Sequence, residues 1–228
     1  MYMRMEILKR CDAALADVRT FYKQDFINYG GRTNDTNELF TEVVAEFVIS
    51  HIDKFEMIPQ ITRLNSYKTN SHDGVFDKKS NRQEEIIAMK MFVQSKEKPF
   101  ALIGSIIDYQ TPLKNKRNDE AGKIDLLADD GQQLIILELK KPDSTETMLR
   151  CIMEGFTYYK TVDKGKLLKD FGRPETYGLS AAPFVFKDSR QYMEMREERP
   201  QLKRLMALLM SKPYYITEDH GKYFVTED

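Results

Sequence analysis

Hydrophobic residues recur at helical spacing near the start of the chain. Between residues 5 and 24 the apolar positions fall three or four residues apart, as on one face of a helix. After a glycine-rich break, Asp35 and Glu38 resemble a capping box that opens a second helix extending to about Ile52. The stretch at 65–82 is polar and rich in turn residues, so we expect it to form the boundary of a core domain.

Beyond this boundary the pattern alternates between helical and strand-like segments. A helix is predicted at about 82–96, and an apolar strand follows at 100–109. Strands at 123–128 and 133–140 flank the turn sequence Asp129-Asp130-Gly131, which is typical of a hairpin. The remaining predicted elements are a helix at about 143–162, a strand at 183–186, a helix at about 189–210 and a hairpin made of 214–217 and 223–226.

The order of these elements predicts an α/β fold in which a mixed sheet lies between helices. We expect a helical N-terminal extension at residues 1–75 and a core domain at 76–228 that ends in a helix and a hairpin. The extension carries no recognisable chemistry. We expect it to shape either a nucleic-acid cleft or a homodimer interface.

Composition narrows the class of protein. The chain is 41% hydrophobic and 31% charged, which is ordinary for a globular protein. No stretch approaches the roughly eighteen consecutive apolar residues of a membrane span, so no membrane partner is expected. The N-terminus becomes charged before a signal-peptide core can form, and the two cysteines offer no disulfide framework. A cytoplasmic location is therefore predicted.

The net charge and the histidine content of the chain bear on whether it binds nucleic acid and on which metal ion it could hold. A net charge of −1 neither requires nor excludes a nucleic-acid partner, because phosphate binding depends on local patches. The three histidines lie far apart in the sequence and near no cysteine, which argues against a zinc site. Any metal would be held by carboxylates, and these suit Mg²⁺ or Mn²⁺.

Three hydrophilic side chains interrupt the two strands of the first predicted hairpin. Glu138 and Lys140 share one face, because side chains alternate along a strand. With a hairpin loop of two or four residues, Asp125 pairs with Ile136 and points to the same face as Glu138. A loop of three residues would turn Asp125 to the opposite face, and Asp108 on the preceding strand would then be the better candidate.

This set of side chains suits phosphodiester hydrolysis. Asp125 and Glu138 can hold a hard divalent cation, with the backbone carbonyl of Leu139 as a further ligand. Lys140 can orient an attacking hydroxide and offset the negative charge that develops on the phosphate. The alternative is that the three residues are surface charges or a structural ion pair. The apolar run before Glu138 argues against it, since an unpaired charge on a buried strand is costly.

The segments Ile124-Asp-Leu-Leu-Ala and Ile136-Leu-Glu-Leu-Lys-Lys resemble the second and third core motifs of the PD-(D/E)xK nucleases. That superfamily has a restriction-endonuclease-like αβββαβ core, and the resemblance covers about residues 82–187. It implies a Mg²⁺-dependent nuclease acting on nucleic acid, with DNA as the expected substrate. The alternative is a catalytically inactive nucleic-acid-binding or scaffold domain of the same fold, although an intact Asp, Glu and Lys set favours the enzyme.

The resemblance also assigns residues on two helices. Family members often carry a glutamate on the helix before the first core strand, and Glu85 takes that catalytic role here, with Glu84 in reserve. Two acids in a first helical turn are equally typical of a favourable helix dipole. Some branches place Gln-x-x-x-Tyr after the lysine, and Glu154 and Tyr158 match the tyrosine but not the glutamine. A solvated, salt-bridged stripe with Arg150 is the alternative at that helix.

Nucleic-acid contacts are predicted at Lys114, Lys116 and Arg117 before the hairpin, and at Tyr158. Further basic candidates for such contacts are Lys78, Lys79, Lys164, Lys166 and Lys169. The alternative for every basic candidate, and the more typical one, is a solvated loop or helix end. From the sequence alone, Lys140→Ala is expected to slow turnover while leaving the fold and Mn²⁺ affinity nearly unchanged.

Overall fold

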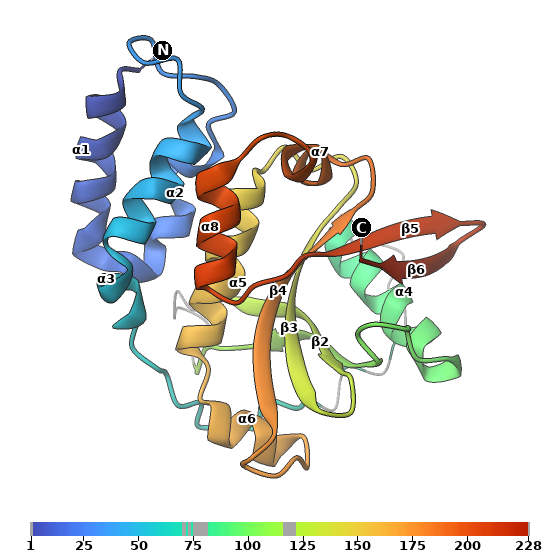
Figure 1. The fold of residues 1–228 in the computed structure, drawn as a ribbon. Coiled ribbons are helices and arrows are strands. Elements are labelled where there is room, and N and C mark those ends of the chain that lie inside the picture. The colour runs from blue at the N-terminus through green and yellow to red at the C-terminus, as the bar shows by residue number, and fades with distance from the viewer. Residues whose placement is uncertain (1, 70–71, 73, 75–81, 116–121, 228) are drawn as a thin grey trace.

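The computed structural model describes residues 2–227, apart from 70–71, 73, 75–81 and 116–121. The predicted α/β class is confirmed, with a six-stranded mixed sheet and helices on both of its faces (Figure 1). The predicted boundary between residues 75 and 76 lies outside the described residues. Within the described part of the chain, no helix is both long enough and apolar enough to cross a membrane.

The strands lie across the sheet in their order along the chain. They are β1 (Ser105–Pro112), β2 (Lys123–Asp129), β3 (Gln133–Lys140), β4 (Gly178–Phe186), β5 (Tyr214–Asp219) and β6 (Lys222–Thr226). The first three strands are antiparallel, β4 runs parallel to both β3 and β5, and β6 returns antiparallel to β5. The parallel step from β3 to β4 requires a crossover connection, and helices supply it.

Helices cover the two faces of the sheet. On one side lies α4 (Gln83–Glu97), and on the other lie α5 (Met148–Thr161) and α8 (Pro200–Leu208) (Figure 1). Outside α5 and α8 pack the N-terminal α1 (Arg4–Ala14) and α2 (Phe40–Ser50). The shorter helices are the 3₁₀ segments η1 (Leu15–Lys23) and η2 (Asp25–Asn28), together with α3 (Ile52–Glu56), α6 (Lys164–Asp170) and α7 (Arg190–Arg196).

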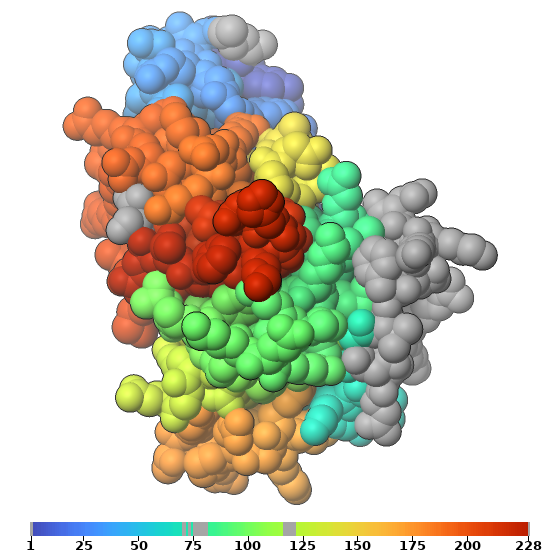
Figure 2. All heavy atoms as spheres, turned by 90° about the vertical axis from the view of Figure 1, so that its right-hand side faces the viewer, coloured from blue at the N-terminus to red at the C-terminus, as the bar shows by residue number. Residues whose placement is uncertain are grey.

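The C-terminal hairpin of β5 and β6 lies beside α4, as the space-filling view shows (Figure 2). Gln94 on α4 fixes this contact, because its side chain donates to the Tyr223 carbonyl at 2.7 Å and accepts from the Tyr223 amide at 2.8 Å. The hairpin therefore closes the edge of the face that α4 covers.

Strand β3 is buried on both faces, as its run of apolar residues predicts. Leu134 and Ile136 join the apolar cluster that contains α5 and the N-terminal helices. Ile135, Leu137 and Leu139 join the cluster beneath α4. Each fully buried aliphatic side chain stabilises the fold by about 1.5–3 kcal/mol. A charged residue on this strand therefore stands in a well-packed interior.

Several predicted helix boundaries are wrong, and local chemistry explains two of them. The helix expected at 143–162 begins at Met148, because the Thr147 hydroxyl caps it by accepting from the Arg150 amide at 3.1 Å. The helix expected at 189–210 is two helices, since the residue before Pro200 is disfavoured in the helical region and Arg199 has φ −128° and ψ 69°.

The N-terminal and β1 boundaries also differ from the prediction. The first α-helix ends at Ala14 and continues as the 3₁₀ segment η1, and the second begins at Phe40 instead of Asp35. The strand expected at 100–109 begins only at Ser105. Before it, Phe100 and Gly104 exchange backbone hydrogen bonds of 2.8 and 3.0 Å in a tight loop.

The register of the β2–β3 hairpin decides where Asp125 points. Leu127 pairs with Ile136 and Leu126 with Leu137, so the predicted pairing of Asp125 with Ile136 is wrong by two residues. The turn sits one residue later than predicted, because the Asp130 carboxylate accepts from the amides of Gln132 and Gln133. Continued by one residue, this register sets Asp125 across from Glu138, on the same face, because a shift of two residues preserves the alternation.

A matched pair of glycine variants tests how firmly this hairpin is held. Gly104 has φ +69°, and a Cβ there would lie 2.0 Å from the Asp129 carbonyl oxygen. Gly131 has φ +94°, with open space around it. Gly131→Ala should lower the free energy of unfolding by about 1–2 kcal/mol, the cost of the left-handed conformation. Gly104→Ala should cost at least about 1 kcal/mol more, because backbone must move. Urea denaturation measures both, and equal losses would contradict the close approach.

Candidate active site

A pocket of about 440 Å³ opens where β2, β3, α4 and the start of α5 meet. Three of the residues singled out from the sequence as catalytic, Asp125, Glu138 and Lys140, line it together. Its other lining residues are Glu84, Lys141, Asp143, Ser144, Thr145, Glu146, Arg150, Glu154 and Tyr158. Charged groups from separate parts of the chain therefore converge here.

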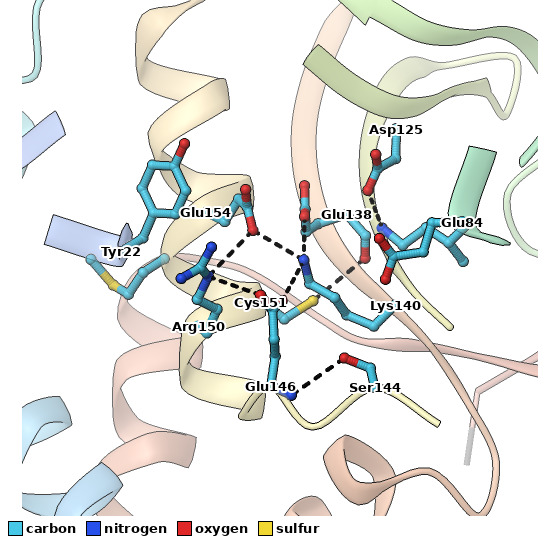
Figure 3. Close-up of polar contacts among 12 residues, drawn as sticks. Tyr22, Glu84, Asp125, Glu138, Lys140, Ser144, Glu146, Arg150, Cys151 and Glu154 are labelled. Carbon is cyan, nitrogen blue, oxygen red and sulfur yellow. Dashed lines mark hydrogen bonds and ion pairs between the residues drawn. The ribbon is translucent and has the colours of Figure 1, made fainter. Parts of the chain in front are cut away.

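Lys140 is the centre of this pocket. Its ammonium lies 2.7 Å from Glu138, 2.8 Å from Glu146 and 3.0 Å from Glu154, as the dashed lines in Figure 3 show. The Lys140 side chain is only 6% exposed. Burial would lower the pKa of Lys140, but Glu138 and Glu154 outweigh burial and raise it well above its usual value. Lys140 is therefore a fixed cation.

Glu138 has one satisfied and one unsatisfied carboxylate oxygen. Its Oε1 accepts from Lys140, whereas the buried Oε2 has no hydrogen-bond partner among the described residues. Burial, followed by the negative charge of Glu154, raises the pKa of Glu138 well above its usual value. An unpaired buried oxygen of this kind is costly, and either a proton or a cation would relieve it.

Asp125 stands beside Glu138 at the end of the hairpin ladder. Beyond the last backbone pair, its Oδ2 accepts from the Leu139 amide at 3.0 Å, and its Oδ1 accepts from the Gln110 side chain at 3.0 Å. Desolvation raises the pKa of Asp125 to about 7, against the opposing charge of Lys140. The Leu139 side chain lies on the other face of the sheet, and its carbonyl as a metal ligand stays a prediction.

The acid that α4 brings to the pocket is Glu84, not Glu85. Glu84 accepts from the Lys141 amide at 3.2 Å and lines the pocket. Glu85 pairs instead with Arg82 at 2.8 Å and with Lys123 at 4.0 Å. The sequence favoured Glu85 because the helical wheel ranks the two acids by the apolar residues around them. The pocket, however, lies at the edge of that face.

The stripe on α5 is salt-bridged but not solvated, so the solvated alternative is wrong. Glu154 and Tyr158 are both buried, and the Tyr158 hydroxyl donates to Glu154 at 2.9 Å. Burial would raise the pKa of Glu154, but Lys140, Glu138 and Arg150 together outweigh burial and lower it. Arg150 lies 3.7 Å from Glu154 and 3.5 Å from Glu146.

Glu146 is the site residue that sequence reasoning missed, because it was considered only as a helix cap. A signal was present in the spacing of Glu146, Arg150 and Glu154, which alternate in charge four residues apart. Gln110, whose side chain donates to Asp125, carried no comparable signal.

Asp108 on β1, the alternative to Asp125 in the sequence analysis, forms its hydrogen bonds outside the pocket. It is buried and accepts from His72 and Thr111, each at 2.6 Å, and it does not line the pocket. Of the predicted nucleic-acid contacts before the hairpin, Lys114 follows β1, where its carbonyl accepts from Arg63 at 2.6 Å. Lys116, Arg117, Lys78 and Lys79 lie outside the described residues.

No protein-family model, curated protein or solved structure matches the chain. In the part of the chain that the structure describes, no three His, Cys, Asp or Glu side chains are arranged to hold a metal ion. The contacts of Asp125, Glu138 and Lys140 are therefore the basis for interpreting the chemistry of the pocket.

The contacts of Lys140 change what is expected of Lys140→Ala. Removing the ammonium would leave three carboxylates, those of Glu138, Glu146 and Glu154, facing one another with Arg150 as the nearby cation. Breaking a buried ion pair from one side typically costs about 3–5 kcal/mol. Lys140→Ala is therefore expected to destabilise the fold, contrary to the prediction from the sequence.

The raised pKa of Asp125 predicts how stability depends on pH. Without divalent cations, the pKa of the Asp125 carboxyl is about 7 in the folded chain and about 4 in the unfolded chain, so folding between these pH values takes up a proton. The contribution of this carboxyl to the stability of the fold is therefore fully present below about pH 4 and is lost as the pH rises through 7. Asp125→Asn cannot ionise, so it should gain stability relative to wild type between pH 5 and pH 8.

Urea denaturation in a chelating buffer at these two pH values measures the effect. Asp53→Asn on α3, where the side chain is exposed, controls for loss of one negative charge. A difference between wild type and Asp125→Asn that is the same at both pH values would contradict the raised pKa.

Proposed function

We propose that this chain is a divalent-cation-dependent nuclease of the restriction-endonuclease-like class, which hydrolyses phosphodiester bonds in nucleic acid, with DNA as the expected substrate. The observation that carries the proposal lies in the pocket that Asp125 also lines. One oxygen of the buried Glu138 carboxylate pairs there with the fixed Lys140 ammonium, while the other oxygen has no hydrogen-bond partner among the described residues.

The order of the elements supports this class. From α4 through β1, β2, β3 and α5 to β4, the chain follows the αβββαβ order of that core, with the short α6 added before β4. The parallel β4 lies next to β3, which carries Glu138 and Lys140.

Asp125 and Glu138 are the residues that would hold Mg²⁺ or Mn²⁺. Mg²⁺ often takes only one or two protein carboxylates and keeps several waters, so two acids fit it. The raised pKa values of both carboxyls support the same assignment, because a cation can replace the protons they retain. When bound, such a cation polarises the phosphate and lowers the pKa of a bound water.

The chain's own cations would act on the phosphate. Glu146 and Glu154 hold the Lys140 ammonium in one place, where it can stabilise negative charge as the phosphate is attacked. Arg150 also lines the pocket, where its Nε lies 3.5 Å from Glu146 and 3.7 Å from Glu154. Its guanidinium is a second cation at the pocket that could attract a phosphate oxygen.

Cleavage assays test the proposal directly. Purified protein is incubated with linear, circular and single-stranded DNA and with RNA, in Mg²⁺ or Mn²⁺ and in chelator. Wild type should cleave only with the cation, and Glu138→Gln should be at least about 100-fold slower. Binding of nucleic acid without any cleavage would favour the inactive scaffold instead.

Neighbouring acids on α4 provide a matched comparison in the same assay. Glu84→Gln should slow cleavage by about tenfold or more, because Glu84 lines the pocket. Glu85→Gln should have little effect, since its carboxylate pairs with Arg82 and Lys123 away from the pocket. If Glu85→Gln slowed cleavage more than Glu84→Gln, the catalytic acid of α4 would be Glu85.

The role of Lys140 requires a charge-balanced design. Lys140→Met combined with Glu154→Gln removes one charge of each sign, so the net charge of the pocket stays unchanged. Relative to Glu154→Gln alone, the double variant should lose about 100-fold or more in kcat, or roughly 3 kcal/mol of barrier. Circular dichroism confirms folding, and equal kcat values in the two variants would exclude Lys140 from the chemistry.

A further inference from the structure

A second pocket, of about 400 Å³, adjoins the first across Tyr158, which lines both. The Tyr158 hydroxyl donates to Glu154 in the first pocket and lies 3.5 Å from the hydroxyl of Tyr22, which lines the second. Figure 3 shows Tyr22 beside Glu154 and Arg150. The two pockets are therefore neighbours, separated by a pair of tyrosines.

The second pocket differs from the first in chemistry. Its lining is mostly apolar and includes Leu113, Ile61 and the two tyrosines, with the half-buried Thr20 from η1. No acidic side chain is among its described lining residues. Its volume lies in the range typical of sites for small organic groups. An uncharged aromatic ring would fit this lining, whereas a metal ion would find no carboxylate.

Positive charge connects the two pockets. Arg150 of the first pocket lies 5.4 Å from the centre of the Tyr22 ring, and Lys23 of the second lies 5.6 Å from it. Arg19 also lines the second pocket, and its Nε donates to Asp17 at 3.1 Å. The exposed Arg19 and Lys23 thus place two basic side chains at the second pocket, and Arg150 lies on the Tyr22 ring between the pockets. A phosphate backbone is the complementary ligand.

We propose that the second pocket takes one unpaired nucleobase of the substrate strand, with Arg19 and Lys23 on the adjoining backbone. The inference rests on the proposed nuclease function, which puts the scissile phosphate in the first pocket. The next nucleotide then lies at Tyr158, beside an apolar, aromatic-lined space.

The consequence is a preference for unpaired strands. A base in a duplex must leave its stack and its partner to enter such a pocket, and this costs a few kcal/mol. A single strand or a frayed end largely avoids that cost, so it should bind more tightly than a blunt duplex of the same sequence.

Fluorescence anisotropy with 5′-labelled oligonucleotides tests this preference. A single strand and the blunt duplex of the same sequence are compared in Ca²⁺, and gels check that both stay intact. Thr20→Trp should fill the pocket and weaken single-strand binding about tenfold, with less than a twofold effect on the duplex.

The double variant Arg19→Ala/Lys23→Ala should weaken single-strand binding and reduce its dependence on salt. Both side chains are exposed, so this variant should fold even where Thr20→Trp does not. Its matched control is Lys9→Ala/Lys54→Ala, which removes two exposed cations that do not line the pocket.

The outcomes separate the two proposals. If wild type cleaves nucleic acid but the variants that fold bind the single strand as wild type does, the base pocket is wrong and the nuclease stands. If single-strand binding depends on this pocket but wild type never cleaves in Mg²⁺ or Mn²⁺, the nuclease is wrong and the base pocket stands. If wild type neither binds nor cleaves, both are overturned.

Discussion

The buried ammonium of Lys140 is the interaction on which the pocket depends. It joins three carboxylates from three places in the chain: Glu138 on the same strand, Glu146 before α5 and Glu154 within α5. A buried charge is tolerated only when its partners are fixed, and fixing these partners also fixes α5 against β3. The ammonium thus sets both the local packing and the position of the candidate catalytic groups.

This arrangement satisfies Lys140 but leaves its surroundings with excess negative charge. The carboxylates of Glu138, Glu146 and Glu154 face the two cations Lys140 and Arg150, and Asp125 adds a fourth acid nearby. Burial, with neighbouring negative charge as a smaller cause, raises the pKa values of Asp125 and Glu138, and one Glu138 oxygen has no hydrogen-bond partner among the described residues. The hard cation proposed for this pocket would supply the missing positive charge.

The sequence predicted the hairpin well because its signals are local. Alternation fixed the shared face of Glu138 and Lys140, and the strand bounds at 133–140 are those of the structure. Other features depend on tertiary contacts that no local pattern records. The choice of Glu84 over Glu85 depends on the Lys141 amide, and the burial of Glu154 depends on how α5 lies against β3. Even the two-residue register error traces to the Asp130 side chain, which moves the turn.

The N-terminal segment, in which the sequence shows no chemistry, is built into the site. Thr147 caps the start of α5, and its hydroxyl donates to the Ile27 carbonyl at 2.7 Å while its amide donates to the Asn28 side chain at 3.1 Å. Those two contacts hold the first turn of the helix that carries Arg150 and Glu154. Because they come from η2, the placement of the Lys140 partners depends on the extension being folded against the sheet. The extension therefore positions the charged groups of the pocket, whatever further surface it offers to a partner.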